Sequence, residues 1–192
     1  MIAKHEGDNR IQSEIERLDP EGRYVQLDAD SHAVRYSTDI IQHREIHSYE
    51  GEEEPARAFL VAWLCTEGGY LPANIELEKE YSIGRPKVGG RLDILLKHPT
   101  GTPYALIEVK GPEEFESEQD KYIEGQLFNI APLELGCSVL CFTTVESFDD
   151  TVIPRAKTIA YGEVLVAWFT VVDGYFSRVW TASRPVCERV TT

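Results

Sequence analysis

Two short runs of apolar residues stand close together in the middle of the chain. The first lies in residues 90–97 and the second in 103–110, and a turn that contains Pro and Gly separates them. Because both sides of each run are apolar, they predict central strands of a sheet that other elements cover on both faces. Further strands are predicted at 74–82 and 137–143, which gives a sheet of roughly four or five strands.

Longer segments around these strands have the spacing of helices. In residues 53–66, apolar side chains form one stripe along a helix, and they are Phe59, Leu60, Trp63 and Leu64. Residues 114–131 form the second predicted helix, with four side chains available for packing: Phe115, Tyr122, Leu127 and Ile130. Together with the strands, these helices predict an α/β fold in which helices flank a mixed β-sheet, in the order αβββαβ.

Both ends of the chain are predicted to add strands to this sheet. A short helix that ends near Asp19 precedes two strand-like segments at 23–27 and 33–36. Residues 151–192 are again strand-like, and an Asp-Gly turn predicts a β-hairpin between residues 164 and 180.

The length of the chain suggests its domain organisation. A chain of 192 residues is long enough for one domain with a sizeable core. We therefore expect a single domain over residues 1–192. It comprises an N-terminal extension packed on the core (1–50), a central core (51–150) and a C-terminal β-hairpin extension (151–192).

Three charged residues interrupt the apolar strands. Asp93 lies within the first run, and Glu108 and Lys110 end the second. Because strand residues two apart point to the same side, Glu108 and Lys110 share a face, and a hairpin would bring Asp93 alongside them. Burying such groups is costly unless they meet each other, a cation or water. The set therefore suits a divalent metal that activates water against a phosphodiester, and the alternative is a structural Glu–Lys pair at an exposed strand end.

The order of these motifs resembles the PD-(D/E)xK nuclease superfamily, and more narrowly the N-terminal nuclease domain of type I restriction enzyme R subunits. The resemblance extends from about Glu53 to Thr144. Its motifs, in chain order, are Glu53-Glu54-Pro55-Ala56-Arg57, Gly69-Tyr70-Leu71-Pro72, Ile75-Glu76-Leu77-Glu78, Gly90-Arg91-Leu92-Asp93-Ile94, Ala105-Leu106-Ile107-Glu108-Val109-Lys110-Gly111-Pro112, Glu124-Gly125-Gln126 and Ser138-Val139-Leu140-Cys141-Phe142-Thr143-Thr144. The resemblance implies a restriction-endonuclease-like fold and a metal-dependent endonuclease that hydrolyses DNA, with its nuclease core in 51–150.

The resemblance also implies roles for single residues. Asp93, Glu108 and the carbonyl oxygen of Val109 would ligate Mg²⁺, with Mn²⁺ as a substitute, because hard oxygen ligands suit this ion. Lys110 would orient or deprotonate the attacking water and stabilise negative charge on the phosphate. The base need not be strong, since a bound metal lowers the pKa of its water.

Two further catalytic residues are predicted with alternatives left open. Gln126 matches the family's glutamine and would bond a phosphate or a water, although Ile130 stands where the family has a tyrosine. Gln119 with Tyr122 is a competing register, and an ordinary surface amide is the other interpretation of Gln126.

Glu53 is the other candidate. It falls near the edge of the apolar stripe and Glu54 on its far side, and Arg57 stands four residues on, where it would orient Glu53. Alternatively, the acidic residues only complement the helix N-terminus.

The net charge of −14, from 33 acidic and 19 basic residues, is unusual for a protein that binds DNA, because phosphate contacts need a basic patch. One explanation is that basic residues gather around the cleft, namely Arg85, Lys87, Arg91, Lys97 and Lys110. The other is that motor, methyltransferase or specificity subunits or domains grip the DNA. We expect weak intrinsic affinity for DNA, and a catalytically inactive nuclease-fold module for binding or assembly is the alternative function.

Several other classes of protein are not indicated. No apolar run reaches membrane-spanning length, and we expect no signal peptide. The four cysteines lack zinc-type spacing, and Cys137 and Cys141 flank a strand, which predicts buried thiols and a reducing cytoplasm. The glycine-rich segment 84–90 lacks the ending of a P-loop, so no ATPase motor is predicted. His43 and His47 have no nearby third ligand and are expected to be solvated.

Overall fold

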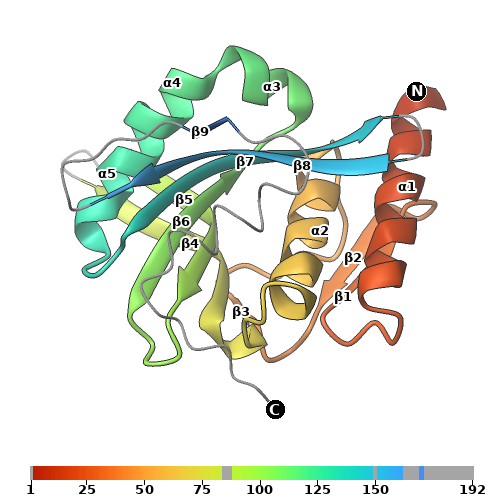
Figure 1. The fold of residues 1–192 in the computed structure, drawn as a ribbon, viewed down its shortest axis with the longest axis horizontal. Helices are drawn as coiled ribbons and strands as arrows, with labels where there is room; N and C mark the ends of the chain where they lie inside the picture. The colour runs from red at the N-terminus through yellow and green to blue at the C-terminus, as the bar shows by residue number, and fades with distance from the viewer. Residues whose placement is uncertain (1, 84–87, 149–150, 162–168, 171–192) are drawn as a thin grey trace.

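The computed structural model describes residues 2–83, 88–148, 151–161 and 169–170. In this part of the chain, a mixed sheet of seven strands has the order β3-β4-β5-β6-β7-β8-β9 (Figure 1). The strands are β3 (Ile41–Gln42), β4 (Ile75–Ile83), β5 (Val88–Lys97), β6 (Pro103–Val109), β7 (Val139–Phe148), β8 (Thr151–Ala160) and β9 (Phe169–Thr170). The predicted mixed α/β architecture is confirmed, and β4 to β7 lie where strands were expected.

The sheet combines antiparallel and parallel pairs. β4, β5 and β6 form an antiparallel meander, and β6 then pairs in parallel with β7. A parallel pair needs a crossover connection, and here the helical residues between β6 and β7 supply it. β8 pairs antiparallel with β7 along its whole length.

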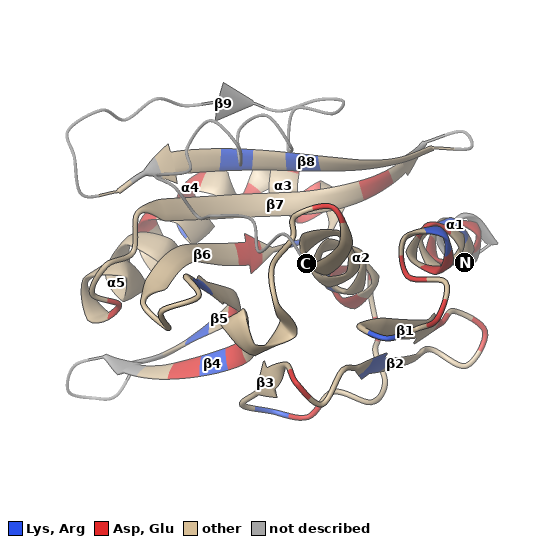
Figure 2. Cartoon of the chain, turned by 60° about the horizontal axis from the view of Figure 1, so that its bottom comes forward, with Lys and Arg blue, Asp and Glu red and all other residues tan. Residues whose placement is uncertain are grey.

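Helices cover both faces of the sheet, as the apolar runs predicted. On one face, α1 (Ile2–Leu18) and α2 (Glu53–Thr66) share a core with residues such as Ile94 and Ile107. On the other face, the crossover packs on residues such as Leu95 and Leu106. Figure 2 shows α2 between the sheet and the layer formed by α1, β1 (Val25–Asp28) and β2 (Ala33–Tyr36). Because it is enclosed, α2 is buried nearly all round instead of along a single stripe.

The second predicted helix is interrupted. Its residues form α3 (Pro112–Ser117), α4 (Gln119–Tyr122), a π-helical turn (Ile123–Leu127) and α5 (Phe128–Ile130). Glu118 has φ −122° and ψ 25°, which is not helical and breaks the segment. Gly125, a weak helix former, lies inside the π-helical turn. One continuous helix over 114–131 was therefore a wrong prediction.

The two extensions differ from what was expected. β1 and β2 pair with each other in a separate two-stranded sheet, and the short β3 is the strand of the described N-terminal extension that joins the main sheet. Their apolar residues, such as Val25 and Tyr36, pack against α1 and α2 in the core instead of at a sheet edge. At the other end, β8 lies ahead of the predicted hairpin, which falls mostly outside the described residues.

Two smaller predictions concern membranes and thiols. Among the described residues, no helix has the length and apolar character needed to cross a membrane. Cys65, Cys137 and Cys141 are free and buried, which confirms the buried thiols expected at 137 and 141.

Candidate active site

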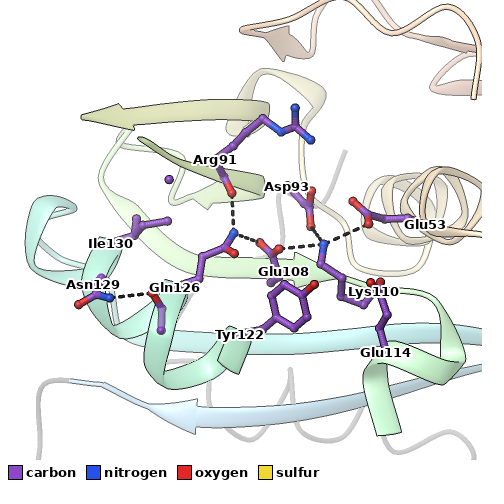
Figure 3. Close-up of a pocket in the computed structure, with 12 residues that line it drawn as sticks. Glu53, Arg91, Asp93, Glu108, Lys110, Glu114, Tyr122, Gln126, Asn129 and Ile130 are labelled. Carbon is purple, nitrogen blue, oxygen red and sulfur yellow. Dashed lines mark hydrogen bonds and ion pairs between the residues drawn. The ribbon is translucent and has the colours of Figure 1, made fainter. Parts of the chain in front are cut away.

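The predicted catalytic residues lie together in one pocket of about 630 Å³ beside the carboxyl end of β6 (Figure 3). Its lining comes from α2, β5, β6 and the crossover. It consists of Glu53, Gly90, Arg91, Asp93, Glu108, Lys110, Glu114, Tyr122, Gly125, Gln126, Asn129 and Ile130. All five side chains that the sequence singled out as catalytic are in this set.

Strand register explains why the two strand acids meet. Ile94 of β5 pairs with Ile107 of β6, so the next residues outward, Asp93 and Glu108, stand on neighbouring strands at the same level. Each carboxylate is only 2% exposed. The strand end is therefore buried, and not exposed as the alternative of a structural Glu–Lys pair assumed, although Glu108 and Lys110 do form an ion pair.

The Lys110 ammonium stands at the point where four oxygen atoms converge. Lys110 Nζ lies 2.9 Å from Glu108 Oε1, 3.1 Å from Glu53 Oε2 and 3.6 Å from Asp93 Oδ2. It also donates a hydrogen bond of 2.8 Å to the carbonyl oxygen of Val109. Three elements, α2, β5 and β6, thus supply oxygen ligands to a single cation.

Asp93 is held from two sides. Its Oδ1 accepts a hydrogen bond of 2.8 Å from Arg57 Nη2, and its Oδ2 accepts one of 2.7 Å from the backbone N–H of Val109. Arg57 Nη2 also lies 3.3 Å from Glu53 Oε1. Glu53 is the first residue of α2, so it occupies the first helical turn and reaches the pocket as well.

Gln126 is not an ordinary surface amide. Its Nε2 donates hydrogen bonds of 2.6 Å to Glu108 Oε2 and to the carbonyl oxygen of Arg91. Gln126, in the π-helical turn, points toward Arg91, which lies in the first half of β5 (Figure 3). From the competing register, the Tyr122 ring lies 5.0 Å from Lys110 Nζ, whereas Gln119 is outside the lining.

The cluster of charged side chains around the pocket contains more acids than bases. Ion pairs join five carboxylates, of Glu53, Glu54, Glu78, Asp93 and Glu108, to three cationic side chains, of Arg57, Arg91 and Lys110. With every group ionised, two negative charges are left over, which is the charge that one divalent cation neutralises.

Burial and this surplus of negative charge shift the pKa values of the pocket side chains. Burial, and then the charge of Asp93, raises the pKa of Glu108 well above its ordinary value, and the pKa of Glu53 is raised for the same reasons. Burial alone would lower the pKa of Lys110, but the charges of Asp93, Glu108 and Glu53 outweigh it and raise that pKa. Lys110 is therefore a cation at neutral pH in this arrangement.

The donor set suits a hard cation, although the acids are not spaced as ligands of a bound metal. Among the described residues, no three His, Cys, Asp or Glu groups form a ready metal-binding cluster. The ammonium of Lys110 stands between the acids, within 3.6 Å of one oxygen of each. Carboxylate and carbonyl oxygens are the ligands that Mg²⁺ and Mn²⁺ prefer, so the residues fit such an ion once Lys110 moves aside.

Other residues considered from the sequence lie elsewhere. Lys97 pairs with Glu76, and His43 Nε2 also lies 2.8 Å from Glu76. Lys97 was therefore wrongly placed at the cleft, and His43 has a partner that was not expected. His47 is exposed, as expected. Of the remaining basic residues, Arg91 lines the pocket, while 85 and 87 fall outside the described residues.

Sequence reasoning missed the layer of charge behind the pocket. Glu78 and Glu54 both bind Arg57, and the hydroxyl of Tyr36 donates a hydrogen bond of 2.5 Å to Glu54. The sequence did contain one indication of this layer, since pairing of 74–82 with 90–97 in a hairpin sets Glu78 opposite Asp93. No periodicity connects Tyr36 with α2.

Comparison with known proteins adds no relative. The chain matches no family model, and it matches no curated protein. The site's geometry therefore carries the functional conclusion.

The raised pKa of Glu108 gives a prediction for the metal-free protein. The folded state binds this proton more tightly than the unfolded chain, so the associated stability is present below the ordinary pKa of 4.5 and is lost as the pH rises through the raised value. Glu108→Gln has no such loss. Its unfolding free energy relative to the unmodified protein, from urea titrations in EDTA, should grow as the pH rises from about 4 to about 8.

Glu80, which is exposed on β4 opposite Arg91 of β5, gives the control. Glu80→Gln removes an acidic side chain outside the pocket, and the difference measured for Glu108→Gln is read relative to it. A pH-independent difference for Glu108→Gln would contradict the predicted proton uptake by Glu108.

Proposed function

We propose that this protein is a metal-dependent endonuclease of the PD-(D/E)xK superfamily that hydrolyses DNA phosphodiester bonds. The observation that carries the proposal is the convergence of oxygens from Glu53, Asp93, Glu108 and Val109 on the Lys110 ammonium. The order α2, β4, β5, β6, crossover helices, β7 supports it, because it matches the αβββαβ order of a restriction-endonuclease-like core.

The proposed roles follow from the contacts. Asp93, Glu108 and the Val109 carbonyl would hold Mg²⁺ or Mn²⁺. When bound, such an ion supplies positive charge at the scissile phosphate and lowers the pKa of its water. Lys110, freed from the carboxylates, would point its ammonium into the pocket, where it orients the attacking water and stabilises charge on the phosphate. The water oxygen would attack phosphorus in line and give its proton to bulk water, while the bond from phosphorus to the leaving oxygen breaks and that oxygen takes up a proton from solvent.

The acidity of the chain bears on how DNA reaches the site. With a net charge of −14, the domain repels a polyanion except where cations are concentrated. Arg91 and Lys110 are basic side chains that line the pocket in the described structure. We propose that a motor, methyltransferase or specificity component of a restriction system brings the DNA, and that the isolated chain binds DNA weakly.

Nicking of supercoiled plasmid tests the proposal. The purified chain, at micromolar concentration and low salt, should nick the plasmid with Mg²⁺ or Mn²⁺ and be inactive in EDTA. Crystals soaked in Mn²⁺ should show an anomalous peak between Asp93 and Glu108. A peak without nicking would favour the inactive binding or assembly module, and neither peak nor nicking would reject the metal-dependent function.

Replacing Gln126 should have a smaller effect on nicking, and it tests whether this residue positions a metal ligand without binding the metal itself. Its amide fixes Glu108 Oε2 and reaches across to the backbone of Arg91. Gln126→Ala should lower the nicking rate about 10- to 100-fold, the usual effect of losing a group that orients a metal ligand. Asn129→Ala, in the same lining but bonded only locally to the carbonyl oxygen of Gly125, should change the rate less, and equal losses would contradict the role of Gln126.

A further inference from the structure

Arg57 connects the pocket to the charged layer behind it. Its guanidinium comes from the second turn of α2 and is only 3% exposed. Nη1 lies 3.0 Å from Glu54 Oε2 and 2.6 Å from Glu78 Oε1, while Nη2 lies 2.8 Å from Asp93 Oδ1 and 3.3 Å from Glu53 Oε1. One nitrogen thus binds two acids outside the pocket lining, and the other binds two acids within it.

This division determines which carboxylate oxygens face the pocket. Arg57 occupies Oδ1 of Asp93 and Oε1 of Glu53. The second oxygen of each acid, Asp93 Oδ2 and Glu53 Oε2, is then directed at the ammonium of Lys110. A planar guanidinium imposes such a geometry, whereas an ammonium acts as a point charge and does not.

Two acids form ion pairs with the other side of the Arg57 guanidinium. Glu54 accepts the hydroxyl hydrogen bond of Tyr36, a residue of β2 that is 4% exposed. Glu78 has φ 57°, in the left-handed region that a residue with a side chain rarely adopts. In this conformation its carboxylate lies between Arg57 and Arg91, with Oε2 2.8 Å from Arg91 Nε.

We propose that Arg57 is a positioning residue of the site: it orients Asp93 and Glu53 so that one oxygen of each is directed at the place that the Lys110 ammonium occupies and that a bound metal would take. The inference rests on the proposed function and assigns to the N-terminal extension, through Tyr36 and Glu54, a part in holding the site. Arg57 touches neither substrate nor metal in this role and acts through the two acids.

Arg57→Lys is the primary test, because it keeps the buried charge and removes the planar fork. The Mn²⁺ dissociation constant, measured by electron paramagnetic resonance on protein whose fold is checked by circular dichroism, should rise about 10- to 100-fold. Nicking by the variant should keep increasing at Mn²⁺ concentrations that already saturate the unmodified protein. Arg155→Lys is the matched control, since Arg155 also bridges two acids, Glu116 and Glu146, but lies outside the pocket lining.

Glu78→Gln provides a second variant in case Arg57→Lys does not fold. It weakens an ion pair of Arg57 without changing a pocket acid, and should weaken Mn²⁺ binding more than Glu80→Gln, which removes the same charge from an exposed position on β4. A purely structural role would lower the melting temperature and leave the Mn²⁺ dissociation constant unchanged, which would overturn the inference. Failure of the unmodified protein to bind Mn²⁺ would reject the proposed function itself.

Discussion

Glu108→Gln and Asp93→Asn should each lower Mg²⁺-dependent nicking by about 10²–10³-fold or more while leaving the protein folded. The loss is of the size measured when a preorganised electrostatic contact to a transition state is removed. Both substitutions keep the shape of the side chain and remove one of the two strand carboxylates, which lie at the base of the pocket and are 2% exposed. The measurement is the initial rate of conversion of supercoiled to nicked plasmid, with calorimetric titration of Mn²⁺.

The two substitutions should differ in their structural effect. Asp93 accepts hydrogen bonds from Arg57 and from the N–H of Val109. In Asp93→Asn, the NH2 group of the amide faces one of these two donors, and this mismatch lowers stability. Glu108 also accepts from two donors, Gln126 on Oε2 and Lys110 on Oε1, but neither is a backbone group, and neutralising Glu108 relieves surplus negative charge. Glu80→Gln should retain full nicking. Nicking that persists in purified Glu108→Gln would leave the nuclease assignment without support.

Lys110→Met should lower nicking by about 10²–10³-fold, the range for loss of a group that stabilises charge in the transition state, and yet bind Mn²⁺ more tightly. The reason is that Lys110 Nζ occupies the place of a cation, within 3.1 Å of oxygens from Glu53, Glu108 and Val109. A unit positive charge about 4 Å from a divalent metal costs at least roughly 2 kcal/mol, twice the value for two unit charges in bulk water, so its removal should raise the affinity about 30-fold or more. Calorimetric titration with Mn²⁺ measures the change.

Lys121→Met is the control for charge alone. Lys121 lies next to Tyr122 with its side chain 63% exposed and pairs with Glu118. Its removal should leave the Mn²⁺ affinity nearly unchanged. Unaltered or weaker Mn²⁺ binding by Lys110→Met would show that the ammonium and the metal do not compete for the same oxygens.

The parts of the structure that follow from local pattern could be predicted. Apolar runs bounded by turn residues identified β4 to β7, and helical spacing identified α2. The rule that strand residues two apart share a face set Glu108 beside Lys110, and a hairpin then brought Asp93 to them. Each of these steps depends on neighbours in the sequence or on one turn.

The rest depends on contacts between distant segments. β1 and β2 had strand-like sequences, but whether they join the main sheet or cover α2 is decided by packing against Ile15, Leu60 and similar residues of α1 and α2. The left-handed conformation of Glu78 has no sequence signal, since glycine is the residue that usually marks it. It is held by Arg57 and Arg91, which come from other elements.

The parallel pairing of β6 with β7 has a consequence for biosynthesis. The backbone N–H of Lys110 donates a hydrogen bond of 3.0 Å to the carbonyl oxygen of Thr143, and the crossover that carries Gln126 lies between these residues in the chain. Non-local pairing of this kind forms late, after the loop between the strands has closed. A nascent chain whose β7 residues are still inside the ribosome therefore contains every acidic residue of the pocket, but its Lys110 backbone has no partner strand. The proposed cleavage activity should first appear only after β7 has emerged.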